Sequence, residues 1–315
     1  MPEPVRITPD NFTRAETDMY FTGQVKDGAF GSFYHHREPA DVNHQSVVAM
    51  NRDTLYSSAI FDLDAGPVTI SLPDALGRFM SMEVIDEDQY ALEVVYGGSH
   101  ILTRERVGTR YVQAVVRTFA DPNDPKDLAA VHALQDAIAV RQAASGRFET
   151  PSWDPASQKQ VREALSALGK TLSDSRRMFG PRSKVDPVRH LIGTAIGWGG
   201  NPAADAFYIM GATPQNHGKT VYRLSVPANV PVDGFWSVSV YDKDGYFAPN
   251  EQSAYSVNNV TAQKDLDGGV TVQFGGAGGT NRLPITPGWK FAVRLYRPRP
   301  EILSGAWVFP EPQPV

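Results

Sequence analysis

The sequence of 315 residues contains no cysteine. This absence excludes disulfide bonds, thiolate nucleophiles and thiolate metal ligands, so packing must stabilise the folded state. No apolar run approaches the roughly 20 residues that a membrane-spanning helix needs. The first stretch, MPEPVRITPDNFTRAE, also lacks the basic and apolar regions of a signal peptide. We therefore expect a cytoplasmic protein without a membrane span, although a leader removed by processing would leave the same sequence.

Clusters of basic residues are missing as well. The formal net charge is -5, and no Lys/Arg cluster stands out, which argues against a nucleic-acid partner. The shares of hydrophobic residues (41%) and charged residues (21%) are those of a soluble globular protein. The chain is long enough for two packed units, each with its own core. The sequence leaves open whether the chain forms a homo-oligomer.

The familiar catalytic motifs are absent too. The sequence has no G-x-S-x-G elbow, no Walker loop, no H-E-x-x-H and no dinucleotide fingerprint at the start of a helix. These absences exclude the common hydrolase, kinase, zincin and dehydrogenase classes, and we expect no cofactor. We also expect no metal, because the histidines show no ligand spacing beyond the adjacent pair His35-His36. The alternative is a metal site assembled from distant residues, such as His44 and a carboxylate.

Alternating apolar and polar residues predict strands in both halves of the chain. Val68, Ile70 and Leu72 alternate with polar residues, and the pattern continues to Phe119. In the second half we expect strands at 220–226, 235–241, 270–274 and 289–296. One face of the last strand is apolar and the other is mixed, which is typical of an antiparallel sheet.

Helical periodicity interrupts these strands. We expect a helix within 8–27 and a short one at 188–196. Between them, Asp124-Pro125 and Asp154-Pro155 each predict a helix start, because Asp accepts from free amides and Pro fits the first helical position. The apolar stripes of these two helices should be buried, which applies to the following residues: Val131, Leu165 and Leu168.

The predicted fold is mainly β, of the α+β class. It consists of two antiparallel β-sandwich or jelly-roll-like units with an inserted helical segment. We expect an N-terminal β-unit with its leading helix at 1–123, the helical segment at 124–180 and a C-terminal β-unit at 181–315.

The two β-units share a weak internal duplication. FMSMEVID, from Phe79 to Asp86, lies over FWSVSVYD, from Phe235 to Asp242, without a gap. Thr54-x-Tyr56 likewise lies over Thr220-x-Tyr222. In this alignment Glu83 becomes Ser239 and Asp53 becomes Lys219, so the acidic pair occurs once. We interpret the repeat as one β-unit that occurs twice.

From Asn11 onward the sequence resembles bacterial proteins that join two domains of unknown function, numbered 1254 (N-terminal) and 1214 (C-terminal). The motifs that carry the resemblance are NFTRAE (11–16), NRDTLYS (51–57), HLIGTAIGWGGNP (190–202), VDGFWSVSVYD (232–242) and LPITPGWKFAVRLYRP (283–298). The resemblance implies a mainly β two-domain protein with helical parts. It implies little about chemistry.

Three residues are our candidates for catalysis. Arg52 and Asp53 stand next to each other at a predicted strand entrance, where a guanidinium could hold an anion and a carboxylate could act as a base. The alternative is an ion pair that stabilises a turn. Glu83 lies within a predicted strand with apolar neighbours, so burial would raise its pKa. The alternative for Glu83 is a solvated sheet face.

Aromatic and amide side chains near loop signals are the candidates for substrate binding, because such groups line pockets for small molecules. They are Asn51, Tyr56, Tyr90, Trp198 and Asn201. We predict that these residues converge on one cavity with Arg52, Asp53 and Glu83.

Three classes of function fit this sequence. The leading hypothesis is an enzyme that acts on a small organic molecule by cofactor-independent acid–base chemistry, of the hydrolase, lyase or isomerase type. The alternative is a small-ligand-binding or envelope-associated module without turnover. The third class is a structural or oligomer-building protein, in which the aromatic residues form core and interface.

Overall fold

The structure, a computed structural model, describes residues 3–45, 48–172 and 174–315. The chain divides into two compact units. Unit 1 comprises Met1–Arg37, Leu55–Phe119 and Ala129–Ala203. Unit 2 comprises Glu38–Thr54, Ala120–Leu128 and Ala204–Val315. By this division, most of the predicted helical segment 124–180 belongs with unit 1.

The helices are α1 (Phe12–Lys26), α2 (Arg104–Val107), a 3-10 helix (Leu63–Ala65), α3 (Pro125–Asp136), α4 (Pro155–Gly169), α5 (Pro187–Gly197) and α6 (Pro300–Ser304). The predicted helices correspond to α1, α3, α4 and α5, and three short helices were not predicted. Asp154 accepts hydrogen bonds from the amides of Ala156 and Ser157 at the start of α4. This confirms the predicted start, at which Pro155 follows the capping carboxylate.

The predicted burial of the helical stripes is confirmed at two of three positions. Val131 is fully buried and Leu165 nearly so, but Leu168 is 52% exposed, so its predicted burial is wrong. Leu165 packs with Ile192 of α5, with Val161 beside them. Leu168 lies roughly 60° around the helix from Leu165. The buried stripe of α4 is therefore narrower than the run of leucines.

Unit 1 contains two sheets. Its strands are β1 (Tyr34–His35), β2 (Thr54–Asp62), β3 (Val68–Leu72), β4 (Met80–Asp86), β5 (Ala91–Val95), β6 (Gly98–Leu102), β7 (Tyr111–Phe119) and β8 (Ala139–Gln142). The larger sheet has the order β1-β2-β7-β4-β5, and the smaller one has the order β6-β3-β8. Apolar residues of both sheets form one core, in which Met82 of β4 and Val116 of β7 pack with Ile70 of β3. The unit is therefore a β-sandwich.

Unit 2 is also built from two sheets. Its strands are β9 (Ala206–Gly211), β10 (Tyr222–Val226), β11 (Trp236–Tyr241), β12 (Ser256–Asn258), β13 (Val270–Phe274), β14 (Arg282–Leu283), β15 (Lys290–Tyr296) and β16 (Gln313–Pro314). The sheets have the orders β12-β11-β15-β9 and β14-β13-β10-β16. Leu224, Val238 and Val293 belong to the core between them. The mainly β, largely antiparallel fold is confirmed.

The two units share the order of their strands. β2-β7-β4-β5 in unit 1 corresponds to β9-β15-β11-β12 in unit 2, and β6-β3-β8 corresponds to β13-β10-β16. In both units the central strand pairs in the same register, because Ser81 is opposite Arg117 and Ser237 is opposite Arg294. Glu83 and Ser239 therefore hold corresponding positions.

One part of the sequence alignment is wrong. Tyr56 lies in β2, whereas Tyr222 begins β10, which corresponds to β3 by strand order. The Thr-x-Tyr motif therefore marks different strands in the two units. The alignment of Asp53 with Lys219 is therefore wrong as well.

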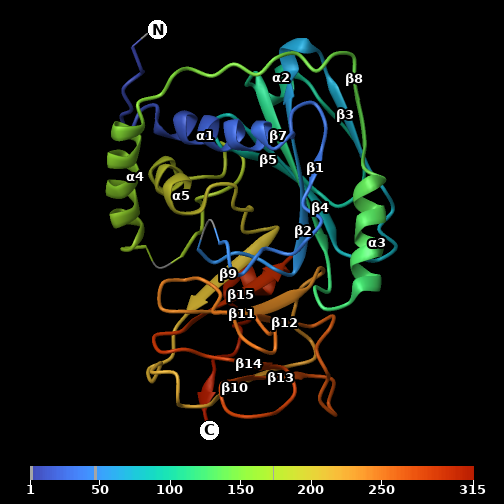
Figure 1. Cartoon of the computed structure of the whole chain (residues 1–315), viewed down its shortest axis with the longest axis vertical. Coiled ribbons are helices and arrows are strands. Elements are labelled where there is room, and N and C mark those ends of the chain that lie inside the picture. Colours follow the sequence, from blue (N-terminus) through green and yellow to red (C-terminus); the bar gives the residue numbers. More distant parts are fainter. Residues whose placement is uncertain (1–2, 46–47, 173) are drawn as a thin grey trace. The chain divides into compact units, whose positions relative to one another are not determined.

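Helices cover the second face of the larger sheet in unit 1. In Figure 1, α1, α4 and α5 lie together at one side of this sheet. Phe21 of α1 packs with Ile60 of β2 and Tyr111 of β7 on that face. Gln113, also on β7, donates a hydrogen bond to Gln24 of α1. The face that points away from the sandwich core is therefore buried as well.

Candidate functional site

The structure divides the predicted site residues between the two units. Asn51, Arg52 and Asp53 belong to unit 2, while Glu83 belongs to unit 1. The remaining candidates also belong to unit 1, namely Tyr56, Tyr90, Trp198 and Asn201. The convergence of Arg52 and Asp53 with Glu83 stays a prediction.

Glu83 lies in a buried ion pair within the larger sheet of unit 1. Its side chain is fully buried, and its Oε2 atom lies 2.8 Å from Nη1 of Arg117, whose side chain is 7% exposed. Glu83 sits on β4 and Arg117 on the neighbouring strand β7. The predicted burial of Glu83 is confirmed. The prediction was incomplete, because it did not include the Arg117 guanidinium that pairs with the Glu83 carboxylate.

Arg117 gathers two of the predicted binding residues around Glu83. Nη1 of Arg117 also donates to Oδ1 of Asn201 at 3.3 Å, and Nη2 donates to the carbonyl of Gly199 at 3.1 Å. The guanidinium lies 5.4 Å from the centre of the Tyr56 ring, within cation–π range. Glu83, Tyr56 and Asn201 thus meet at an arginine that the sequence analysis missed.

Further polar groups continue this face of the sheet. Ser81 and Gln113 are buried, and they alternate along their strands with the apolar residues of the sandwich core. Oε1 of Gln113 is buried and has no hydrogen-bond partner among the residues that the structure describes. We call Tyr56, Ser81, Glu83, Gln113 and Arg117 the polar face of unit 1.

Tyr90 and Trp198 have other partners in unit 1. The ring of Tyr90 stacks on His190 with centroids 4.3 Å apart, and the guanidinium of Arg182 lies 4.4 Å from the Tyr90 ring centre. Trp198 stacks on Tyr20 of α1 at 4.5 Å. Both aromatic residues are held by stacking partners.

Unit 2 buries an arginine at the position that corresponds to Arg117. Arg294 is 4% exposed and donates to the Ser239 hydroxyl, to the Tyr241 hydroxyl and to the carbonyls of Ala49 and Met50. Burial by itself lowers the pKa of Arg294. Tyr241, Tyr296 and Asp53 outweigh burial and raise that pKa above its ordinary value. Arg294 is therefore a permanent buried cation.

Asn51 and Asp53 lie beside this buried cation. Asn51 donates to the hydroxyl of Tyr296 at 2.9 Å and accepts from the amide of Asp53. Asp53 is 2% exposed, and its Oδ1 atom accepts from the Ser256 hydroxyl at 2.7 Å. Its Oδ2 atom is buried and has no hydrogen-bond partner in the ranges 3–45, 48–172 and 174–315. The charge of Arg294 compensates the Asp53 carboxylate.

Arg52 points to different groups from its neighbour Asp53. Its guanidinium donates to the carbonyl of Ala40 and lies 5.2 Å from the centre of the Tyr255 ring. Burial lowers the pKa of Arg52. These contacts fasten the segment around Ala40, and the role of Arg52 in holding an anion stays a prediction.

Two carboxyl groups that the sequence analysis did not single out have displaced pKa values. Burial raises the pKa of Asp18, on α1, to about 6, against the hydrogen bond from the Trp153 indole. Burial also raises the pKa of Asp86, at the end of β4, to about 6. Both values lie where a carboxyl group can exchange a proton near neutral pH.

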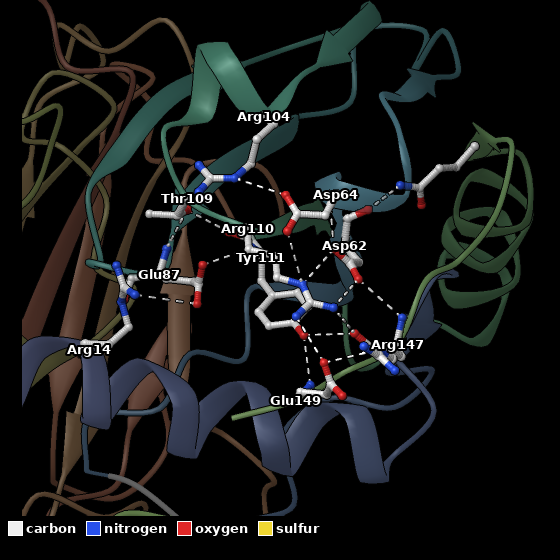
Figure 2. Close-up of polar contacts among 11 residues, drawn as sticks. Arg14, Asp62, Asp64, Glu87, Arg104, Thr109, Arg110, Tyr111, Arg147 and Glu149 are labelled. Atoms are coloured by element: carbon white, nitrogen blue, oxygen red, sulfur yellow. Dashed lines mark hydrogen bonds and ion pairs between the residues drawn. The ribbon is translucent and has the colours of Figure 1, made fainter. Parts of the chain in front are cut away.

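A second polar network in unit 1 surrounds Asp62 and Arg110. Figure 2 shows Asp62 at the end of β2, where it accepts from Nε and Nη2 of Arg110 at 3.1 and 2.9 Å. Arg110 also reaches Glu149 at 3.1 Å, and Glu149 pairs with Arg147. Burial raises the pKa of Asp62, but its hydrogen bonds outweigh burial and hold that pKa below its ordinary value. This network fastens the segment 147–149 to the sheet.

Tyr111 joins this network to Glu87. In Figure 2 the Tyr111 side chain lies between Arg110 and Glu149, and its amide donates to Oε2 of Glu87 at 2.9 Å. Glu87 in turn lies 3.8 Å from Nη1 of Arg14 on α1. The polar contacts of unit 1 therefore extend from the end of β2 to the turn after β4.

Within residues 3–45, 48–172 and 174–315, no group of three or more His, Asp and Glu side chains is placed to hold a metal ion. Among the same residues, no helix has the length and apolar character needed to cross a bilayer.

A sequence signal marks the two buried arginines. Both strands contain Val-Arg-x-aromatic, from Val116 to Phe119 and from Val293 to Tyr296. A single arginine inside an apolar strand is costly to bury without partners, which makes it a site candidate. For Asp18 we find no such signal, because charged residues on a helix are commonly solvated and nothing in the sequence around Asp18 marks it as buried.

Two family models match parts of the chain. The model of the protein of unknown function DUF1254 matches residues 30–105, and that of the protein of unknown function DUF1214 matches residues 210–300. None of the curated proteins compared with the sequence matches it.

Two solved structures show the same fold. The VPA0106 protein from Vibrio parahaemolyticus is 18% identical with a TM-score of 0.73, and the match covers 97% of each chain. An uncharacterized protein from Burkholderia cenocepacia is 13% identical with a TM-score of 0.52, and the match covers 98% of this chain and 87% of that one. The chain therefore belongs to the two-domain proteins that join DUF1254 on the N-terminal side to DUF1214 on the C-terminal side.

Proposed function

We propose that the polar face of unit 1 is a site where a small organic molecule undergoes acid–base chemistry without a cofactor. The reaction is of the hydrolase, lyase or isomerase type. The observation that carries the proposal is the contrast between the two faces of one sheet. One face packs Met82 and Val116 into an apolar core, while the other buries Glu83, Arg117 and Gln113.

A purely structural sheet gains little from such a face. Burying a polar group without compensation costs on the order of 1–3 kcal/mol, and burying one ion of a pair costs several kcal/mol. Apolar side chains of similar size would fill the same buried positions without this cost. Polar groups at this depth are typical of sites that bind and orient a ligand.

The residues have distinct roles in this proposal. Arg117 stabilises negative charge on the substrate, and Glu83 holds the guanidinium in place through the 2.8 Å contact. Tyr56 and Asn201 orient the substrate by their ring and amide. The unsatisfied Oε1 atom of Gln113 is a ready acceptor for a substrate donor.

Ligand binding without turnover is the second candidate. The ion pair between Glu83 and Arg117 favours it, because a carboxylate held by a guanidinium is a weaker base than an unpaired one. Under this alternative the same residues bind the molecule and release it unchanged.

The experiment begins with a panel of small carboxylic acids, amides and alcohols. Compounds that raise the melting temperature of the protein are then incubated with it in D2O and followed by proton NMR. The enzyme proposal expects loss of the compound or exchange of its carbon-bound hydrogen for deuterium. The binding alternative expects a raised melting temperature with no change in the compound.

Two variants decide whether the polar face of unit 1 is responsible. Tyr56→Leu, which removes the ring, should abolish the shift in melting temperature that the compounds cause, and Ser239→Ala should keep it. Ser239 is the control because it lies in unit 2, at the position that Glu83 of the polar face holds in unit 1. Equal shifts in both variants and in the wild type would contradict the proposal.

A further inference from the structure

The motif GWGGN, at residues 197–201, is part of the sequence signature of this chain, but in the proposed function only its Asn201 has a role. The motif follows α5 directly, because that helix ends at Gly197. The amide of Gly200 donates to the carbonyl of Gly197 at 3.1 Å, which closes a turn. This turn sets the direction of the acceptor groups that come with it.

Two acceptors of the motif meet the same guanidinium. The Gly199 carbonyl accepts from Nη2 of Arg117 at 3.1 Å, and Oδ1 of Asn201 accepts from Nη1 at 3.3 Å. Glu83 lies 2.8 Å from the same Nη1 atom. A planar guanidinium with acceptors at both terminal nitrogens cannot rotate without losing hydrogen bonds. The motif therefore fixes the orientation of Arg117 in the polar face of unit 1.

The backbone of the motif requires glycine at two positions. Gly199 has a φ angle of 73°, a left-handed conformation that other residues rarely adopt. A Cβ atom on Gly200 would lie 2.6 Å from the ring of Phe179. Without side chains at these positions, the chain can turn tightly against Phe179 and present the Gly199 carbonyl to Arg117.

Trp198 attaches the motif to helix α1. Its ring stacks on Tyr20 with centroids 4.5 Å apart, and it meets Phe21 at 6.1 Å with the ring planes nearly perpendicular. Its Nε1–H group donates to the hydroxyl of Thr17 at 3.0 Å. Thr17 is fully buried, and its hydroxyl donates in turn to the carbonyl of Thr13. Ring contacts and the N–H group together fix the indole on α1.

We propose that Thr17 and Trp198 are positioning residues for the polar face of unit 1, which act on Arg117 through the Gly199 carbonyl and Asn201. Their effect on a ligand rests on the proposed function, but the positioning of Arg117 does not. Gly199 follows Trp198 directly, so a rotation of the indole moves the carbonyl that accepts from Arg117. In this proposal Trp198, which the sequence predicts to bind substrate, acts through Arg117 and not by contact.

A second indole of unit 1 provides the matched control. Trp153 also donates its Nε1–H to α1, where Oδ2 of Asp18 accepts it at 2.8 Å. The two acceptors, Thr17 and Asp18, are consecutive residues and both are buried. The residue after Trp153 caps the start of α4, so this indole orients a different part of unit 1. An effect on the polar face should therefore appear in Trp198→Phe and not in Trp153→Phe.

The first measurement needs no ligand. The Nε–H signal of Arg117 in a proton–nitrogen NMR spectrum reports how firmly the guanidinium is held. Thr17→Val removes the acceptor of the Trp198 indole and keeps the shape of the side chain. We expect about tenfold faster hydrogen exchange at Nε of Arg117, which corresponds to one lost hydrogen bond. Thr17→Ser keeps a hydroxyl and should restore the wild-type rate. Equal rates in Thr17→Val and the wild type overturn the proposal.

The two indole variants are compared by the same signal. Trp198→Phe should accelerate exchange at Nε of Arg117 by about tenfold or more, because it loses the N–H group and part of the stacking on Tyr20. Trp153→Phe should leave the rate unchanged. Equal acceleration in both variants would show a general loosening of unit 1 and would overturn the proposal.

Ligand binding separates this proposal from the proposed function. For a compound that binds the wild type, calorimetric titration should give about tenfold weaker binding to Thr17→Val and to Trp198→Phe. Thr17→Ser and Trp153→Phe should bind it with wild-type affinity. Unchanged affinity in Thr17→Val and Trp198→Phe overturns their effect on the ligand and leaves the proposed function standing. If the wild type binds none of the compounds, the proposed function fails, and the exchange rates at Arg117 still decide the positioning role.

Discussion

The two units place an arginine at the same point of the same kind of sheet and neutralise it in different ways. Arg117 in unit 1 pairs with Glu83 on the neighbouring strand at 2.8 Å. Arg294 in unit 2 has Ser239 at the corresponding position, and its acceptors are hydroxyl and carbonyl groups. The nearby carboxylate, Asp53, comes from the segment before β2.

The two units therefore share the strand order and the buried arginine, but the carboxylate that balances the arginine comes from a different position in each unit. A strand pair supplies both charges in unit 1, so the ion pair is part of the sheet. In unit 2 the charge of Arg294 is balanced by several neutral acceptors and by Asp53.

We propose that the units derive from one duplicated β-unit. The corresponding turns support this, because Asp86 and Asp242 each accept from the amides two and four residues ahead.

The largest expected effect is the loss of the unit 1 ion pair. Glu83→Ala leaves the buried guanidinium of Arg117 without its carboxylate and should destabilise the protein by about 3–5 kcal/mol. The double variant Glu83→Leu with Arg117→Met should recover most of this loss, since two apolar residues need no compensation. Denaturant unfolding measures both. A double variant that is no more stable than Glu83→Ala would show that other contacts hold this face.

A change of pH should distinguish the units next. Asp18 and Asp86 of unit 1 have pKa values raised from 3.8 to about 6. A raised carboxyl pKa means that the folded state binds the proton more tightly than the unfolded state, so the stability that these two groups contribute is present below pH 4 and is lost as pH rises through 6. Each group lowers stability by about 3 kcal/mol at pH 7 relative to its protonated form.

Hydrogen exchange resolves this effect by peptide. Peptides from unit 1 should lose more protection between pH 4.5 and pH 7 than peptides from unit 2, after correction for intrinsic exchange. Equal losses in the two units would show that the pKa values of Asp18 and Asp86 are not raised. Asp18→Asn combined with Asp86→Asn should reduce the difference between the units.

In unit 2 the loss of the carboxylate should matter less. Asp53→Asn keeps an acceptor for the Ser256 hydroxyl, and Arg294 retains its hydroxyl and carbonyl acceptors. We expect a loss of about 1–2 kcal/mol, because the buried cation loses a nearby charge while keeping its hydrogen bonds. Calorimetry compares it with Glu83→Gln. The contrast between the units fails if Asp53→Asn is the more damaging change.

The smallest effect should be the same in both units. Asp86→Ala and Asp242→Ala each remove a carboxylate that accepts two backbone hydrogen bonds in a turn. We expect about 1 kcal/mol for each variant, measured by thermal unfolding. The two variants are compared at pH 4.5, because at pH 7 the burial penalty on the charged form of Asp86 exceeds this loss. A difference of several kcal/mol between the variants would argue against equivalent turns.

Much of the fold was predictable from local patterns. Asp-Pro at a helix start, as at Asp154, marks a helix because both residues act within one turn. Alternation predicted strands such as β13, whose bounds Val270–Phe274 agree with the prediction. The exposure of Leu168 was not predictable, because it depends on how much of α4 its neighbours cover.

The candidate site was only partly predictable. Alternation placed Glu83 inside a strand, but the identity of its partner, Arg117, depends on which strands are neighbours and in which register. The raised pKa of Asp18 was beyond prediction, because it depends first on burial and then on Glu87 and Asp88, which are distant in sequence. The stacking partner of Tyr90, His190, is likewise distant and comes from α5.

Two asparagines give the most direct test of the central claim, that the polar face of unit 1 is where a ligand binds. Asn201 accepts from Arg117 in unit 1, and Asn51 donates to Tyr296 beside Arg294 in unit 2. Calorimetric titration of the compound that most raises the wild-type melting temperature is compared for Asn201→Ala and Asn51→Ala. We predict at least tenfold weaker binding to Asn201→Ala and unchanged binding to Asn51→Ala. Weaker binding to Asn51→Ala alone would contradict the claim.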